Sequence, residues 1–196
     1  MEILLILVGY LLGSVPVGFI LGLRSGIDVR ETGSGNVGAT NVARVLGKRQ
    51  GILTLIADTA KGFLPVILAI QLGASLATTT LVGAAAFLGH LFPIFLKFKG
   101  GKGVATAFGV FLALAPMATL VLVSLFGVTV LTSRIVSLSS ILSALAAPII
   151  LWLFSYPRLV VGMAAFIALA ITWRHQSNIR RLMNGSEPRF GSANSQ

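Results

Sequence analysis

The sequence contains no cysteine and few charged residues. Asp, Glu, Lys and Arg make up 10% of its 196 residues, whereas a soluble domain usually carries about 25%. The lack of cysteine excludes disulfides and thiol chemistry. Hydrophobic residues account for 56% of the chain, and no polar stretch is long enough to fold alone. We therefore predict an integral membrane protein with a single domain, residues 1–196.

Acidic residues and histidine are also scarce, with five Asp and Glu and two His. No Asp/Glu cluster suits a metal ion, so we expect no metal and no cofactor. Phe95 and Arg180 stand where an aspartate would follow the histidines in a His-x4-Asp acyltransferase site. The nucleophile elbow G-x-S-x-G is missing as well. These absences exclude the common hydrolase and acyltransferase sites.

Long uncharged runs are what the sequence does contain. A helix needs about 20 residues to cross a bilayer, and open sheets cannot cross it. The fold is therefore predicted to be an all-α polytopic bundle. The first three spans are expected at about 3–23, 51–72 and 79–98. The first run begins with Glu2 and lacks a basic leader, so we interpret it as a retained span and not as a signal peptide.

The uncharged stretch 104–133 leaves two alternatives. As one helix it would be about 45 Å long, more than the hydrocarbon core of about 30 Å requires. As a hairpin bent near Ala115-Pro116 it would cross twice. Residues 135–154 and 159–173 resemble a further out-and-back pair around Tyr156-Pro157. If the C-terminal tail is cytoplasmic, Arg134 is cytoplasmic too, so 104–133 must cross twice; this favours the hairpin and seven spans. The alternative is five spans, with 104–133 as one tilted span and the last two segments merged or re-entrant.

Basic residues outnumber acidic ones, fifteen to five, for a formal charge of +10. They cluster in three segments that the positive-inside rule places in the cytoplasm. The N-terminus is then outside and the C-terminus inside. This bias explains the charge without nucleic acid as a partner. The clustered residues are Arg24, Arg30, Arg44, Lys48 and Arg49; Lys97, Lys99 and Lys102; and Arg174, Arg180, Arg181 and Arg189.

The first basic loop contains Glu31-Thr-Gly-Ser-Gly-Asn-Val-Gly-Ala-Thr-Asn41. Glycines let backbone N–H groups converge, and the amphipathic stretch 39–48 predicts a short helix whose N-terminus favours an anion. This chemistry suits a phosphate cradle, although a flexible glycine-rich turn is the simpler alternative. The candidate binding residues are Ser34, Gly35, Asn36, Asn41 and Arg44.

The second loop contains Phe98-Lys-Gly-Gly-Lys-Gly-Val-Ala-Thr106. It is not a nucleotide P-loop, because Leu96 occupies the position of the first glycine and Gly103 follows the lysine. A lysine between glycines at a helix start nevertheless suits a phosphate. The candidates here are Gly101, Lys102, Gly103 and Thr106; an ordinary basic loop is the alternative.

Two further polar groups lie near the C-terminus. His175 and Asn178 are three residues apart and share a helix face. Ser137 and Ser140 lie near the predicted cytoplasmic edge, where a helix cap is the simpler interpretation. Within the second span, Asp58 and Lys61 are expected to form an ion pair that braces the site. His90 is expected to be a packed histidine and not a catalyst.

Four segments together resemble the bacterial acyl-phosphate:glycerol-3-phosphate acyltransferases, the PlsY family. The resemblance covers nearly the whole chain, in order. The segments are Ser34-Gly-Asn-Val-Gly-Ala-Thr-Asn41; Asp58-Thr-Ala-Lys-Gly62; Gly89-His-Leu-Phe-Pro93 with the 98–106 loop; and His175-Gln-Ser-Asn178 with its continuation to Glu187.

The resemblance implies transfer of a fatty acyl group from acyl phosphate to the 1-hydroxyl of glycerol 3-phosphate, at the cytoplasmic face of the bacterial inner membrane. It assigns phosphate contacts to six residues: Ser34, Arg44, Lys102, Ser140, His175 and Asn178. We expect Lys102, His175 and Asn178 to be catalytic and the protein to be a monomer. A membrane transporter of phosphate-containing solutes is the alternative, and a membrane phosphatase a weaker one. Transporters hold their polar groups near the midplane, whereas these motifs gather at predicted helix ends.

Overall fold

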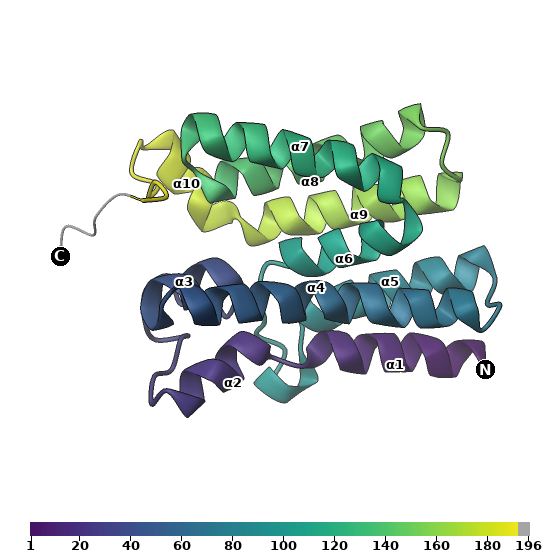
Figure 1. The fold of residues 1–196 in the computed structure, drawn as a ribbon, viewed down its shortest axis with the longest axis horizontal. Helices are drawn as coiled ribbons and strands as arrows, with labels where there is room; N and C mark the ends of the chain where they lie inside the picture. The colour runs from purple at the N-terminus through teal and green to yellow at the C-terminus, as the bar shows by residue number, and fades with distance from the viewer. Residues whose placement is uncertain (192–196) are drawn as a thin grey trace. The chain divides into compact units, whose positions relative to one another are not determined.

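The computed structural model describes residues 1–191, and these are helical with no strand. They divide into two compact units, residues 1–114 and the residues from Ala115 on. Figure 1 shows the helices of each unit. Unit 1 contains α1 (Glu2–Ser14), α2 (Val17–Arg24), α3 (Ala39–Leu46), α4 (Lys48–Gln71), α5 (Leu76–Leu91), η1 (Ile94–Leu96) and α6 (Val104–Leu114). Unit 2 contains α7 (Pro116–Ser133), α8 (Val136–Leu153), α9 (Arg158–Arg174) and α10 (Gln176–Met183).

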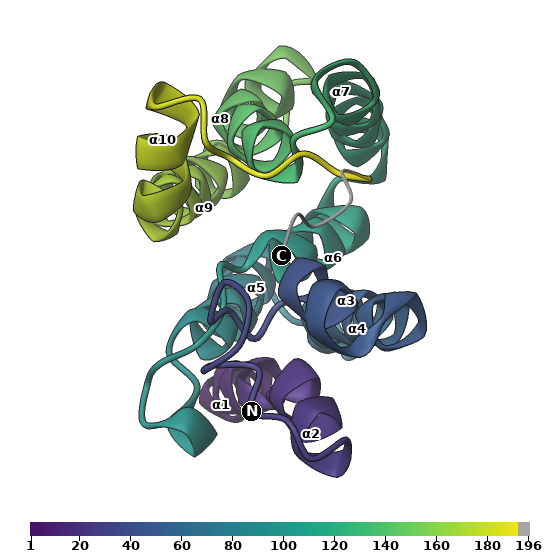
Figure 2. The same cartoon turned by 90° about the vertical axis from the view of Figure 1, so that its left-hand side faces the viewer.

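Small residues let the long helices of unit 1 approach closely. A side chain at Gly13 of α1 would meet the Ala86 carbonyl of α5, and one at Gly89 of α5 would meet the Tyr10 carbonyl of α1. Glycines at positions 62 and 109 do the same between α4 and α6. Such contacts are typical of membrane bundles, where lipid is as apolar as leucine and close van der Waals packing must hold helices together. Figure 2 looks along these helices.

The first span is broken at Val15-Pro16, between α1 and α2. A residue before proline is disfavoured in the helical conformation, and Val15 is indeed extended, with φ −63° and ψ 113°. The amine of Lys61 donates a hydrogen bond of 2.9 Å to the Val15 carbonyl. The Val17 N–H also donates to this carbonyl, at 3.1 Å. A neighbouring helix thus supplies a second donor at the broken turn, in keeping with the need to satisfy backbone groups at membrane depth.

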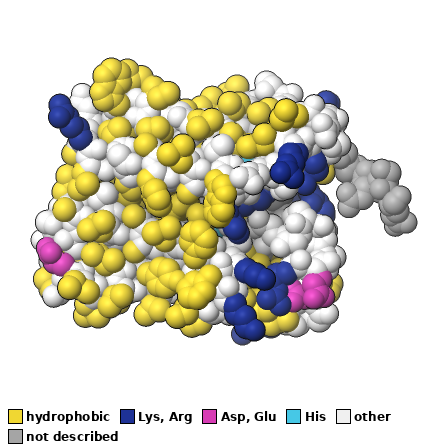
Figure 3. All heavy atoms as spheres, turned by 180° about the vertical axis from the view of Figure 1, so that it is seen from behind, with side chains coloured by type: hydrophobic (Ala, Val, Ile, Leu, Met, Phe, Trp, Pro, Cys, Tyr) yellow, Lys and Arg dark blue, Asp and Glu magenta, His cyan; other side chains and the backbone are white. Residues whose placement is uncertain are grey.

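Five helices in the described residues are long and apolar enough to cross a membrane: Glu2–Arg24 with its break, Lys48–Gln71, Leu76–Leu96 with η1, Pro116–Ser133 and Val136–Leu153. A sixth is possible if α9 and α10, which meet at a bend of 62°, form one span. The first three confirm the predicted spans within a few residues. For the helices of unit 1, seen in the lower half of Figure 3, Lys and Arg gather toward one end, and hydrophobic side chains cover much of the rest of this face.

The predicted break near Ala115-Pro116 is confirmed, because α6 ends at Leu114 and α7 begins at Pro116. The alternative of one helix over 104–133 is therefore wrong. The seven-span count does not follow, however. With 11 residues, α6 is about 17 Å long, well short of a hydrocarbon core of about 30 Å.

Unit 2 confirms the out-and-back pair around Tyr156-Pro157, since α8 ends at Leu153, α9 begins at Arg158, and the two helices pack together. Helix α7 packs on α8. At the other end of α9 the chain bends at His175 into α10, whose polar face is strongly segregated from its apolar face.

Candidate active site

Asn41 organises the first glycine loop. Its side chain is 2% exposed. Its Oδ1 accepts a hydrogen bond of 2.7 Å from the Ser34 N–H, and its Nδ2 lies within hydrogen-bonding distance of three loop carbonyls, those of Val29, Thr32 and Asn36. A side chain at Gly33 would meet Asn41 Oδ1, which explains a glycine there. The loop is therefore folded around the amide of Asn41.

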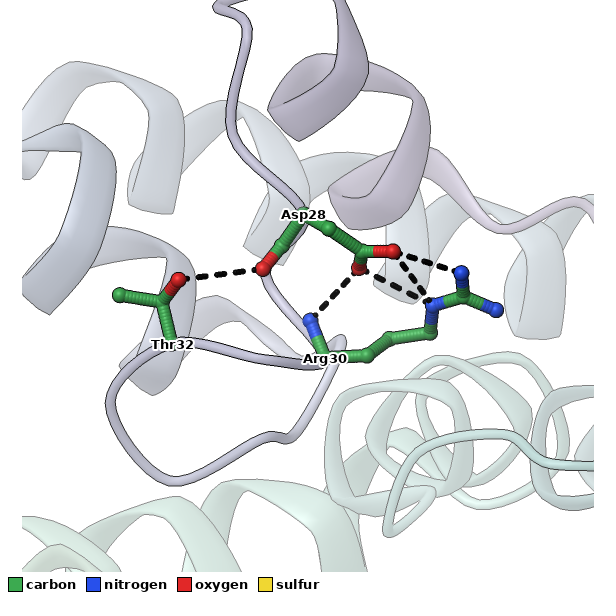
Figure 4. Close-up of polar contacts among 3 residues, drawn as sticks. All are labelled: Asp28, Arg30 and Thr32. Atoms are coloured by element: carbon green, nitrogen blue, oxygen red, sulfur yellow. Dashed lines mark hydrogen bonds and ion pairs between the residues drawn. The ribbon is translucent and has the colours of Figure 1, made fainter.

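A second turn shapes the entry to this loop. The Asp28 carboxylate accepts hydrogen bonds from the backbone N–H and the guanidinium of Arg30, while the Thr32 hydroxyl donates to the Asp28 carbonyl (Figure 4). The hydrogen bond from the Arg30 side chain holds the pKa of Asp28 below its usual value. The Arg30 guanidinium also lies 4.4 Å from the centre of the Phe19 ring. Arg30 is thus held by the loop itself.

The second glycine loop is tied to the end of α5. The N–H groups of Gly100 and Gly101 donate to the carbonyls of Leu91 and His90, both at 3.1 Å. A side chain at Gly101 would meet His90 Nε2. At Gly103, where φ is +83°, a side chain would be 2.6 Å from a methyl group of Leu91. The glycines therefore permit a close backbone approach that fixes the residues around Lys102.

One small core joins the two glycine loops. Leu96 of η1 is buried in a cluster with Val29 and Val37 of the first loop and Val42 of α3. Phe19 and Leu46 pack against this cluster. Segments about 60 residues apart in the sequence are thus held against one another within unit 1, so the two predicted phosphate loops belong to one structure.

Several groups suited to an anion remain accessible in unit 1. Ser34 and Arg44 are exposed, and Asn36 and Lys102 are partly buried. The first turn of α6 begins directly after Gly103, and the first N–H groups of a helix lack partners within it. Donors and cations of this kind are the groups that bind phosphate in proteins, so unit 1 carries a candidate phosphate site.

The predicted ion pair in α4 is confirmed. Lys61 Nζ lies 2.9 Å from Asp58 Oδ1, and both side chains are less than a tenth exposed. His90 of α5 is buried as well, with Nδ1 3.8 Å from the same carboxylate oxygen. Since His90 also contacts the Gly100–Gly101 backbone, this buried cluster connects the first span's break to the second glycine loop.

In unit 2 the carboxylate of Glu187 collects three donors. Its Oε1 accepts hydrogen bonds from Ser137 Oγ at 2.7 Å and Asn178 Nδ2 at 2.6 Å, and its Oε2 lies 2.6 Å from Arg181 Nε. The side chain of Glu187 is 7% exposed. Two residues predicted from separate motifs, Ser137 and Asn178, are therefore joined by a third that lies beyond α10.

Opposing effects act on the pKa of Glu187. Burial raises the pKa. The hydrogen bonds from Ser137, Asn178 and Arg181 together lower it by more than burial raises it, so the net shift is downward. The group is therefore ionised at neutral pH, and its charge is stabilised by the donors around it.

His175 is 3% exposed and stands at the bend between α9 and α10. Its Nδ1 lies 2.8 Å from the Ile171 carbonyl. A carbonyl only accepts hydrogen bonds, so Nδ1 carries the proton in the neutral ring and Nε2 is the acceptor nitrogen. This tautomer is the one that a general base acting through Nε2 requires.

The remaining predicted residues differ in how available they are. The Ser140 hydroxyl donates to the Val136 carbonyl one turn back, and Ser140 is buried. Thr106 is fully buried, and its hydroxyl has no hydrogen-bond partner among residues 1–191. Gly35 lies in the exposed part of the first loop with φ +69°. Within residues 1–191 no group of three metal-binding side chains occurs.

Three organising residues were not predicted: Asp28, Leu96 and Glu187. An Asp side chain favours a turn because it can accept a hydrogen bond from the backbone two residues on, so Asp28 carried a weak local signal. In the sequence, Leu96 is distinctive only as the residue that occupies the position of the first P-loop glycine. Glu187 acts across 50 residues on Ser137, and no spacing rule reaches that far.

The chain matches known proteins over nearly its whole length. Residues 3–185 match the family model described as glycerol-3-phosphate acyltransferase. Proteins of that name are 49% identical over 189 residues in Geobacter sulfurreducens (96% of this chain and 97% of the relative) and 44% identical over 191 residues in Rubrobacter xylanophilus (97% and 96%).

Two solved structures have the same fold. Both are crystal structures of PlsY (YgiH), an integral membrane glycerol 3-phosphate acyltransferase. The glycerol 3-phosphate form is 43% identical, with a TM-score of 0.94 over 97% of this chain and 96% of that chain. The lysophosphatidic acid form is 42% identical, with a TM-score of 0.90 over 97% and 95%. The chain therefore belongs to the glycerol-3-phosphate acyltransferase family.

Proposed function

We propose that this membrane acyltransferase uses acyl phosphate as donor and acylates the 1-hydroxyl of glycerol 3-phosphate, releasing lysophosphatidic acid and inorganic phosphate. The observation that carries the proposal is the shared core of unit 1, in which Leu96 holds both glycine loops together. Both substrates carry a phosphate, and one carries a long apolar chain. Adjacent anion-binding loops on an apolar helical bundle suit that pair.

The proposed phosphate ligands of unit 1 fall into two sets. Ser34, the loop amides and Arg44 of α3 form the first. Lys102 and the first N–H groups of α6 form the second. Asn41 is assigned a positioning role, because its amide is already used by the first loop. Thr106 is buried. We therefore assign phosphate binding in the first turn of α6 to its backbone N–H groups and not to the Thr106 hydroxyl.

The reaction needs positioning and charge stabilisation more than a covalent nucleophile. Acyl phosphate is a mixed anhydride, so phosphate is already a good leaving group. The 1-hydroxyl oxygen attacks the acyl carbon, the carbonyl oxygen becomes an oxyanion, and the bond to phosphate then breaks as the carbonyl re-forms. Cations and amides that stabilise this charge lower the barrier. We assign that role to Lys102 of unit 1. Asn178 of unit 2, whose Nδ2 donates to Glu187, stays a predicted catalytic residue.

The hydroxyl proton must be accepted as the new ester bond forms. His175 Nε2 is one acceptor, since Nδ1 is occupied by the Ile171 carbonyl. A phosphate oxygen of a substrate is the other. The variant His175→Ala distinguishes these two proton acceptors. If it turned over at nearly the wild-type rate, His175 would be excluded as the acceptor. Ser137 and Ser140 stay predicted phosphate ligands; in this structure their hydroxyls donate to Glu187 and to the Val136 carbonyl, so binding there requires them to change partners.

The donor is tested with purified protein in detergent, given glycerol 3-phosphate with palmitoyl phosphate or with palmitoyl-CoA. We expect lysophosphatidic acid to form with palmitoyl phosphate as the donor and not with palmitoyl-CoA. Lys102→Ala and Arg44→Ala should each lower kcat/KM by about 100-fold or more, as the loss of a charged phosphate contact predicts. Arg49→Ala removes an exposed cation in the first turn of α4 and should leave the rate unchanged. Product from palmitoyl-CoA would overturn the donor assignment.

We propose a bacterial inner-membrane location with the loops and C-terminus in the cytoplasm, on the strength of the charge distribution. Seven spans and a monomeric state also stay predictions. Single-cysteine variants offer a direct test, because the protein has no native cysteine. A cysteine at Glu31 should be labelled only after permeabilisation of the inner membrane, and one at Ala74 from the outside.

A further inference from the structure

The turn that follows α5 exposes three large apolar side chains outside any long helix. Ile94, Phe95 and Phe98 are 48%, 60% and 57% exposed. Lys97 and Lys99, which alternate with them, are exposed too. Leu96 alone among the apolar side chains of this turn is buried, in the core that joins the glycine loops. We call residues 94–99 the apolar turn.

The backbone holds these side chains outward. Lys97 and Phe98 both have positive φ, 50° and 62°, a conformation that non-glycine residues adopt at a cost. Three hydrogen bonds fix it, from the N–H groups of Leu96 and Phe98 to the Pro93 carbonyl and from Lys99 N–H to the Leu96 carbonyl. Tyr10 of α1 also donates to the Phe92 carbonyl at 2.7 Å. The exposure is therefore a fixed feature of the fold.

The position of the turn indicates what covers it. Helix α5 contains 16 residues and is about 24 Å long, so η1 stands close to the far boundary of a hydrocarbon core of about 30 Å. Aromatic side chains concentrate at this boundary, and lysines there extend their amines toward lipid phosphates. Anionic lipids attract such cations by about 1 kcal/mol each.

We propose that the apolar turn is an interfacial lipid-binding element, with Phe95 and Phe98 at the level of the upper acyl chains and Lys97 and Lys99 on the phosphates of anionic phospholipids. Lys99 is followed directly by Gly100–Gly103, so the same contact fixes the height of the second glycine loop against the bilayer surface. This inference depends on the span assignment of α5 and not on the identity of the acyl donor.

Depth-resolved quenching tests the insertion. Trp152→Phe and Trp173→Phe remove the two native tryptophans, and Phe98→Trp or, separately, Phe95→Trp supplies one reporter in bilayers of brominated lipids. The reporters should be quenched most by bromine near the top of the acyl chains and little by aqueous iodide. Glu31→Trp, in the exposed first loop, is the matched control and should show the opposite pattern. Iodide quenching of both turn reporters without lipid quenching would overturn the proposal and indicate a protein-docking surface instead.

The lysines are tested by lipid selectivity. Spin-labelled phosphatidylglycerol should associate with the wild-type protein more strongly than spin-labelled phosphatidylcholine, and Lys97→Gln/Lys99→Gln should reduce that preference at least twofold. Arg158→Gln, an exposed cation at the start of α9, is the control that should leave most of the preference intact. An unchanged preference in the double variant would remove the headgroup contact from the proposal. Acyl transfer is not measured in either experiment, so both outcomes are independent of the proposed reaction.

Discussion

Asn41 Oδ1 accepts a hydrogen bond from the Ser34 N–H at 2.7 Å, so the first glycine loop is closed by a side chain of the helix that follows it. The same amide donates to loop carbonyls on its other side. The substrate binding that we propose for this loop therefore depends on a residue that is itself buried and whose amide is already used.

Substituting Asn41 should disable the loop. Asn41→Ala leaves the Ser34 N–H and three loop carbonyls without their partner, at about 1–3 kcal/mol for each buried group left unsatisfied. Asn41→Asp should be no better, because a carboxylate oxygen would face the carbonyls of Val29, Thr32 and Asn36. KM for glycerol 3-phosphate and melting temperature measure both effects. Thr40→Ala, an exposed neighbour, is the control; an Asp variant with wild-type KM would contradict this account.

Gly103 should be intolerant of a side chain for two reasons. Its φ of +83° disfavours one, and a Cβ would overlap the Phe87 ring and lie 2.6 Å from Leu91. Gly103→Ala should raise KM for glycerol 3-phosphate by roughly tenfold, or about 1.4 kcal/mol, because the residues around Lys102 must shift.

The matched control for Gly103 is Gly73→Ala. Gly73 has nearly the same strained backbone, with φ +69°, but nothing within 4 Å of an added Cβ. The Gly73→Ala variant should lose about 1 kcal/mol of stability and keep the wild-type KM for glycerol 3-phosphate. Equal KM effects in the two variants would show that displacement of the Lys102 loop is not the cause.

The buried pair in α4 should behave as a unit. Lys61→Met leaves the Asp58 carboxylate buried without its cation, which typically costs about 3–5 kcal/mol. Asp58→Asn/Lys61→Met removes both charges and should recover at least half of that loss. Thermal unfolding of the single and double variants in one detergent measures the coupling. Additive losses would mean that the two charges do not interact.

Glu187 predicts a dependence of stability on pH. Its pKa is lowered in the folded protein, so its contribution is complete above the ordinary value of about 4.5 and is lost as the pH falls through the folded value. Glu187→Gln should be less stable at pH 7, and its stability should fall less than that of wild type between pH 6 and pH 3. Melting temperature measured across this range tests the sign.

Glu31→Gln removes an exposed carboxylate and is the control for Glu187. Its melting profile should parallel that of wild type. If Glu187→Gln also paralleled wild type over the acid range, the carboxylate would not be the group that couples Ser137, Asn178 and Arg181.

Local features of the sequence were predicted well. Proline chemistry located the break at Ala115, amphipathic spacing located α3, and i,i+3 spacing paired Asp58 with Lys61. Each depends on residues a few positions apart. Helix α3 ends at Leu46 and not, as predicted, at Lys48, because Gly47 with φ +95° separates α3 from α4.

Long-range partners were not predicted, for a physical reason. The Asn41 amide is matched to carbonyls up to 12 residues away, and Glu187 to a serine 50 residues away. A polar residue in a glycine-rich motif looks the same in the sequence whether it faces a ligand or folds the loop. The break at Val15-Pro16 was missed because the hydrophobic run continues through it, and hydropathy does not register a backbone turn.

The break at Val15 has a consequence for how the protein enters the membrane. The first hydrophobic segment reaches lipid with a disrupted turn, and the side-chain donor to the Val15 carbonyl lies 46 residues later in the chain. The second segment carries a lysine and an aspartate that are costly to insert alone. Each segment supplies what the other lacks, so the two are better suited to leave the translocon together, as a preassembled hairpin, than one after the other.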